Sequence, residues 1–131
     1  MNEETPEVEK EVTVNDILGN FPNAPSEAQK ENWKQKHGEI FCSGLTDTEL
    51  FIWRTITRGE FVKMQTELSQ VQVSSLEVEE KVVEKCMLWA TDAGLMSLKN
   101  KAGTLSTLHE QVMQNSNFID PRAASMLVVK L

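Results

Sequence analysis

The sequence has 131 residues, and 20 acidic against 13 basic side chains give it a formal net charge of −7. This length predicts one small domain, and the content of 40% hydrophobic and 25% charged residues is that of an ordinary globular protein. The negative charge argues against a dedicated nucleic-acid binder and against a protein that binds anionic membranes, because both need Lys and Arg to neutralise phosphate.

The sequence also argues against a membrane-spanning or secreted protein. Its most apolar stretch, residues 123–129, is much shorter than the roughly 20 residues that cross a bilayer. Residues 2–4 are polar or acidic, whereas a secretory signal peptide starts with a basic region. We therefore expect a cytosolic protein, in which Cys42 and Cys86 stay reduced and serve as core residues.

The first residues form a strongly acidic segment. Residues 3–11 contain five Glu and one Lys, which leaves a net charge of −4. Such a segment buries too little apolar surface to fold alone, so we expect residues 1–14 to be disordered unless a partner binds them. Residues 15–131 are expected to form a single small α+β domain. As an alternative, Val12 and Val14 can add a strand to the sheet of this domain.

A short helix is expected before the sheet, at residues 27–37. Ser26 and Gln29 have the spacing of a capping box, and Gly38 is a typical residue at a helix end. The only large apolar residue of this helix is Trp33. The helix must therefore either dock through the Trp33 ring or lie against another chain.

A β-hairpin is expected next, with strands at residues 39–43 and 50–56, because both stretches are rich in Ile, Phe and Trp. The second strand is apolar on both faces, so the hairpin needs cover on both faces or an added strand. The strand from Val12 and Val14, or a neighbouring subunit, can supply that cover.

Four helices are expected after the hairpin, which makes the fold a hairpin followed by a small helical bundle. The residues with the spacing of one apolar helix face in the second of them are Val78, Val82, Val83, Cys86 and Trp89. The helices are expected from Thr57 to Gln70, from Ser75 to Ala90, after Thr104, and from Asp120 onward to Leu131, with a loop at residues 91–103.

The sequence contains no complete catalytic, metal or cofactor motif. The string HEQVM at residues 109–113 has Met113 where a zinc protease needs its second His. A zinc site from His37, Cys42, Cys86 and His109 would lack the closely spaced pair that structural zinc sites use. We therefore predict no catalytic, metal or cofactor-binding residues and a protein that is not an enzyme.

Two segments resemble the small tail-morphogenesis proteins of contractile-tailed bacteriophages. The first is EIFCSGLTDTELFIWRTITRGEF at residues 39–61. The second is VVEKCMLW at residues 82–89, followed by AGTLSTLHEQVMQNSNF at residues 102–118. The resemblance implies a tail assembly chaperone or a baseplate-associated protein without catalytic residues. It leaves open whether the protein stays in the finished virion.

This resemblance favours a non-enzymatic tail or baseplate assembly protein, present in the host cytoplasm during assembly and, as a further option, in the virion tail or baseplate. Its partners would be other tail or baseplate proteins or further copies of itself, with no nucleic acid and no membrane. The alternative is a small acidic cytosolic adaptor that binds another protein, as a nucleic-acid mimic for example. The candidate partner-binding residues are Trp33, Phe51, Trp53, Arg54 and Arg58. If one face of the second strand stays exposed, its apolar side chains form a patch with Arg54 and Arg58 at the rim; the alternative is that the following helix covers Trp53.

Overall fold

The computed structural model describes residues 14–118, 126 and 128–131. These residues form six helices and a three-stranded antiparallel sheet, which confirms the predicted α+β class with a hairpin followed by a helical bundle. In chain order the elements are α1 (Val14–Leu18), α2 (Glu27–His37), β1 (Ile40–Gly44), β2 (Leu50–Arg54), α3 (Arg58–Leu68), α4 (Ser75–Cys86), β3 (Met87–Ala90), α5 (Asp92–Asn100) and α6 (Ala102–Asn115).

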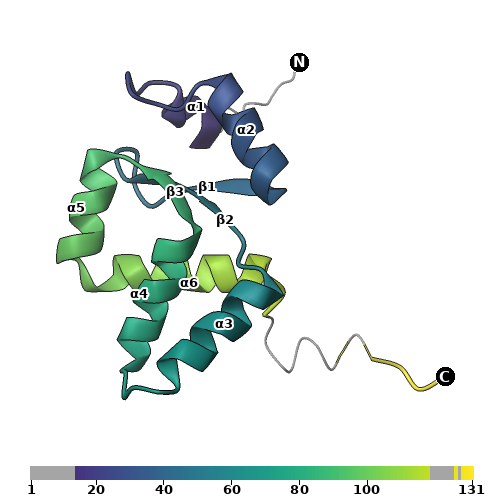
Figure 1. Ribbon diagram of the computed structural model, residues 1–131. Helices are drawn as coiled ribbons and strands as arrows, with labels where there is room; N and C mark the ends of the chain where they lie inside the picture. Colours follow the sequence, from purple (N-terminus) through teal and green to yellow (C-terminus); the bar gives the residue numbers. More distant parts are fainter. Residues whose placement is uncertain (1–13, 119–125, 127) are drawn as a thin grey trace.

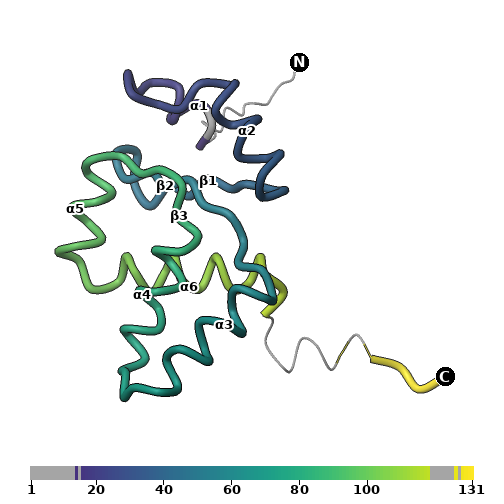
Figure 2. Tube along the Cα trace, viewed as in Figure 1, coloured from purple at the N-terminus to yellow at the C-terminus, as the bar shows by residue number. Residues whose placement is uncertain are grey.

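The sheet lies between two helical layers, with α1 and α2 on one side and α3, α4 and α6 on the other (Figure 1). The tube in Figure 2 follows the chain from the α1–α2 layer through the hairpin into the larger layer. The alternation along β2 matches this arrangement: Leu50 and Ile52 pack towards α1 and α2, whereas Phe51 and Trp53 join the core formed with α4 and α6. All five residues of β2 are buried.

The third strand comes from a part of the chain that was expected to be helical. β2 pairs with β1 along one edge and with β3 along the other, and the second pairing is irregular between Ile52 and Trp53. The helix expected up to Ala90 therefore ends at Cys86, where the chain turns into an extended conformation at Met87. The expected strand from Val12 and Val14 is wrong for Val14, which begins α1, and Val12 lies outside the described residues.

In the larger helical layer, α3 and α4 begin within one residue of where local signals predicted, whereas α6 begins at Ala102 and is not capped by Thr104. Thr57 and Glu60 form a complete capping box at α3. The cap of α4 is Ser74, one residue before the expected Ser75, and it forms a capping box with Glu77. In α4, Val82, Val83 and Cys86 are buried, which confirms most of the predicted apolar face.

The prediction of a loop at residues 91–103 is wrong, because α5 occupies most of it. The Thr91 side chain caps α5 by accepting a hydrogen bond from the Gly94 amide at 3.0 Å. Gly94 is a packing residue: a Cβ there would lie 3.0 Å from Cζ of Phe51. A glycine that indicates a loop in the sequence thus lets this helix approach the core closely.

Thr91 also fixes α5 to the sheet, and its loss should be measurable. Its buried hydroxyl accepts a hydrogen bond from the Leu50 amide and donates one to the Thr48 carbonyl at 2.7 Å. Thr91→Val keeps the shape and leaves these groups unsatisfied, so we expect the free energy of unfolding in urea to fall by about 1–3 kcal/mol. Thr107→Val, at an exposed position on α6, is the control and should change it by less than about 0.5 kcal/mol. An unchanged Thr91→Val protein would contradict the anchoring role.

Two expected features fall wholly or partly outside the described residues. Most of the acidic segment at residues 1–14 lies there, as do Asp120 and Pro121 of the expected last helix. Residues 128–131 are described and carry no helix, so a helix reaching Leu131 is not found. Within the described part of the chain, no helix is both long and apolar enough to cross a membrane.

Candidate partner-binding surfaces

Trp33 holds α2 on its own domain. Its half-buried side chain packs against the cluster formed by Leu18, Leu50 and Ile52. No residue of α2 is fully buried, so this ring is the main apolar attachment of the helix. Of the two options left open by the sequence, the structure has the first, docking through the ring within the same chain.

Phe51 and Trp53 belong to the core, so of the two alternatives for the second strand the structure has the covered one and not the exposed apolar patch. Phe51 is fully buried and Trp53 is 4% exposed. The face of the strand that was expected to need a partner is covered by α4 and α6 of the same chain. The other face is covered by the α1–α2 layer and by Trp89 of β3.

The Trp53 side chain is also satisfied in its polar contacts. Its indole Nε1 donates a hydrogen bond to Oγ of Ser43 at 2.7 Å, and Ser43 in turn donates to Oε1 of Gln111 on α6 at 2.5 Å. The Phe41 ring stacks on the indole, with ring centroids 4.7 Å apart. A buried indole with its donor paired is typical of a structural tryptophan.

Arg54 lies inside the fold and not at the rim of such a patch, which corrects its prediction as a partner-binding residue. Its guanidinium donates two hydrogen bonds to the carboxylate of Glu60 on α3, at 2.6 and 2.9 Å, and one to the carbonyl of Lys85 at 3.0 Å. The side chain is 8% exposed. Arg54 therefore joins β2 to the start of α3 and to the end of α4, where a cation is favourable to the helix dipole.

The pairing with Arg54 is the largest influence on the Glu60 carboxyl. The hydrogen bonds from this guanidinium lower the pKa of Glu60 to about 2. Because the pKa is lower in the folded state, the pair stabilises the fold fully above the ordinary pKa of Glu and loses its effect as the pH falls towards 2. The ionised pair is thus part of the fold at neutral pH.

Replacing Glu60 by Gln should test this pair directly. The change leaves the buried Arg54 charge uncompensated, so we expect the free energy of unfolding at about pH 7 to fall by about 2–3 kcal/mol. The difference from the unchanged protein should shrink towards about pH 2, where Glu60 is also protonated. Urea unfolding across this pH range measures both effects, with Glu67→Gln on the same helix as a control near zero. Equal stability at every pH would contradict the role of the pair.

Arg58 is the one candidate among the five that is exposed. As the first residue of α3, it borders a hollow of ≈ 230 Å³ together with Phe61 and Phe118. The rings of Phe61 and Phe118 lie with centroids 4.8 Å apart, and Phe118 remains exposed. An aromatic ring with an exposed arginine beside it is a combination that protein interfaces use.

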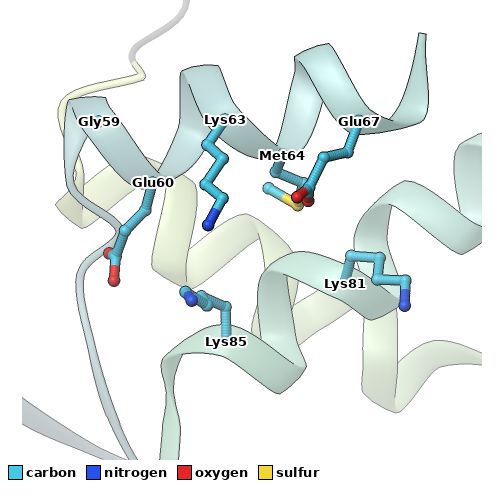
Figure 3. A pocket seen from close by; sticks show the side chains of 7 residues that line it. All are labelled: Gly59, Glu60, Lys63, Met64, Glu67, Lys81 and Lys85. Carbon is cyan, nitrogen blue, oxygen red and sulfur yellow. The ribbon is translucent and has the colours of Figure 1, made fainter. Parts of the chain in front are cut away.

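A second hollow lies between α3 and α4 and is rich in lysine. It has a volume of ≈ 360 Å³, and Figure 3 shows Lys63 and Glu67 on α3 and Lys81 and Lys85 on α4 around Met64. Glu60, which also borders it, is already paired with Arg54. None of the three lysines forms an ion pair within the described chain, so the hollow suits an anionic group such as a carboxylate.

A third hollow is an apolar groove between α4, α5 and α6, with a volume of ≈ 320 Å³. We call it the apolar groove and define it by its lining residues. Leu95 of α5, which is half exposed, is one of the residues that line this groove. The charged residues at its border are Glu80 and Glu84 of α4 and Lys99 of α5. The apolar residues that line it are Val83, Met87, Leu95, Leu98 and Leu105.

The groups with chemical reactivity are dispersed in the described chain. Burial raises the pKa of the Cys86 thiol to about 11, so this thiol is protonated at neutral pH. The four residues considered for zinc form no metal-binding group, and no other cluster of three His, Cys, Asp or Glu suited to a metal occurs in the part of the chain that the structure describes.

Sequence reasoning missed the lysine hollow and the apolar groove. Lys81 and Lys85, four residues apart on a predicted helix, were a usable signal for the hollow. The groove had no usable signal, since Leu95 and Leu98 were assigned to a loop. Comparisons with protein-family models, curated protein sequences and solved structures found no match to this chain.

Proposed function

We propose that this chain is a non-enzymatic assembly protein of the tail or baseplate of a contractile-tailed bacteriophage, acting through protein–protein contacts. The resemblance of residues 39–61, 82–89 and 102–118 to small tail-morphogenesis proteins supports this proposal. Those residues fall on β1, β2 and the start of α3, and on α4, β3 and α6. The resemblance therefore covers the elements that make the core of the described fold.

The observation that carries the proposal is the exposure of large apolar side chains on the described helices. Leu95 and Met96 are exposed next to each other on α5, and Leu76 is exposed at the start of α4. Adjacent exposed apolar side chains such as Leu95 and Met96 are typical of surfaces that contact other proteins. Arg58 with Phe118 adds a second contact point near the start of α3.

The proposed partners are other tail or baseplate proteins, and the proposed place of action is the host cytoplasm during assembly. The competing proposal, an acidic adaptor that mimics nucleic acid, depends on the charge of residues 3–11, which lie outside the described residues. The exposed apolar side chains favour the first proposal, because a nucleic-acid mimic binds mainly through its carboxylates.

Co-expression with individual tail and baseplate proteins tests the proposal. We expect the chain to elute with at least one of them in size-exclusion chromatography and to raise the soluble fraction of that partner. Met96→Asp on α5 and Arg58→Ala on α3 should weaken the complex, whereas Glu67→Gln should not. If the chain binds none of the tail proteins and instead binds a DNA-processing enzyme, the adaptor proposal replaces this one.

A second measurement separates a chaperone from a structural subunit. Mass spectrometry of purified virions should detect the chain in fixed copy number if it is a baseplate subunit. Its absence from virions, together with a complex in the co-expression experiment, identifies an assembly chaperone that leaves before the particle is complete.

A further inference from the structure

The described residues of the segment 126–131 expose their apolar side chains almost completely. Met126 is 83% exposed, Val128 75% and Val129 73%. Isolated exposed apolar residues are common, but several in one short segment leave a contiguous apolar surface in water. A site that buries them would therefore be occupied strongly.

The apolar groove has the chemistry that this segment needs. Its lining is aliphatic, and Leu95 at its side is 51% exposed. We propose that the 126–131 segment of one copy binds in the apolar groove of a second copy, and that the reciprocal contact forms at the same time. The result is a twofold symmetric dimer in which both grooves are covered by alternate apolar side chains of the partner copy's segment.

The charges of the two surfaces match when the segment is extended. Alternate side chains of an extended segment point to opposite sides, so Val129 and Leu131 enter the groove while Lys130 points to its border. Glu80 and Glu84 lie at that border on the α4 side and Lys99 on the α5 side, so Lys130 finds its opposite charges along α4. The apolar side chains then supply most of the affinity of the segment for the groove. The ion pairs with Lys130 determine at which position along the groove the segment binds.

The position of the groove favours a second copy over the chain's own segment. The groove contains Leu105 at the start of α6, whereas the segment follows the end of α6, where Phe118 contacts Phe61 of α3. Figure 1 shows α5 beside the start of α6 and α3 beside its end. Leu105 and Asn115 are about 15 Å apart along the helix. Exposed polar residues of α6, such as Glu110 and Gln114, lie between these two ends of the helix and offer the segment no apolar surface.

The dimer can be measured with the full chain by sedimentation equilibrium from about 1 µM to about 500 µM. We expect the unchanged chain to reach the mass of two chains within this range. Leu95→Asp in the groove and Val129→Asp in the segment should each raise the dimer dissociation constant at least about 100-fold. Val62→Asp is the matched control, because Val62 is 53% exposed on α3, away from the groove, and should leave the constant unchanged. Both test positions are exposed, so circular dichroism melting should show that all variants fold.

Mixing the two test variants gives the sharpest result. Leu95→Asp keeps an intact segment and Val129→Asp keeps an intact groove, so an equal mixture should form a heterodimer through one contact while each variant alone stays monomeric. Lys130→Glu should weaken the dimer of the full chain, and adding Glu84→Lys should restore it. A monomeric unchanged chain over the whole range would overturn the proposal, as would a dimer that Leu95→Asp and Val62→Asp weaken equally. Either result leaves the proposed tail function untouched, since that function is tested on other proteins.

Discussion

Replacing Val82 by Asp should unfold the chain. Val82 has no exposed surface and lies in the core cluster between the sheet and α4 and α6. A carboxylate at this position would be shut off from water among apolar side chains, so we expect a loss of about 5 kcal/mol or more, comparable to the whole stability of a small domain. Far-UV circular dichroism and urea unfolding at neutral pH measure this loss.

The control for this experiment is the same chemical change at a surface position. Val62→Asp on α3 should alter the free energy of unfolding by less than about 0.5 kcal/mol. If Val82→Asp unfolds cooperatively with a loss below about 2 kcal/mol, the packing of α4 on the core is not as described.

Trp53→Ala is expected to destabilise the isolated chain by about 3–5 kcal/mol, the range typical of a large core truncation. The side chain is buried, stacks on Phe41, and donates a hydrogen bond to Ser43. Removing it leaves a cavity between β2 and α6 and frees the Ser43 hydroxyl. Denaturant unfolding of the purified variant measures the loss.

Two further variants show whether that loss comes from the core. Trp53→Phe keeps an aromatic ring and removes the hydrogen bond, so it should cost less than Trp53→Ala. Trp33→Ala, which removes a half-buried indole from α2, should also cost less. A loss below about 1 kcal/mol for Trp53→Ala would instead support the alternative in which this ring is a partner anchor.

The elements that could be predicted are those whose sequence patterns lie within a few neighbouring residues. The hairpin follows from two aromatic-rich stretches, and α3 begins at a capping box formed by Thr57 and Glu60. β3 was not predictable in this way, because Met87 and Trp89 continue the helical spacing of α4. Pairing with the free edge of β2, a tertiary contact, decides that these residues are extended.

The candidate site was predicted less well than the fold, and for one reason. A strand that is apolar on both faces indicates that both faces are covered, but it does not say by what. Here the cover comes from the same chain, so Phe51, Trp53 and Arg54 are interior while Arg58 is exposed. The apolar groove depends on α5, and α5 was hidden by Gly94, whose closeness to Phe51 only the folded structure reveals.

The uneven division of the core has a consequence for local opening. The α1–α2 layer contributes Leu18 as its only fully buried residue among those described, and α2 contributes none. Lifting this layer exposes Leu50 and Ile52 but leaves the packing of α4 on α6 intact, so it requires much less free energy than global unfolding. Backbone amides of α2 should therefore exchange with deuterium well before those of β2, through a species in which one face of the sheet is open to water.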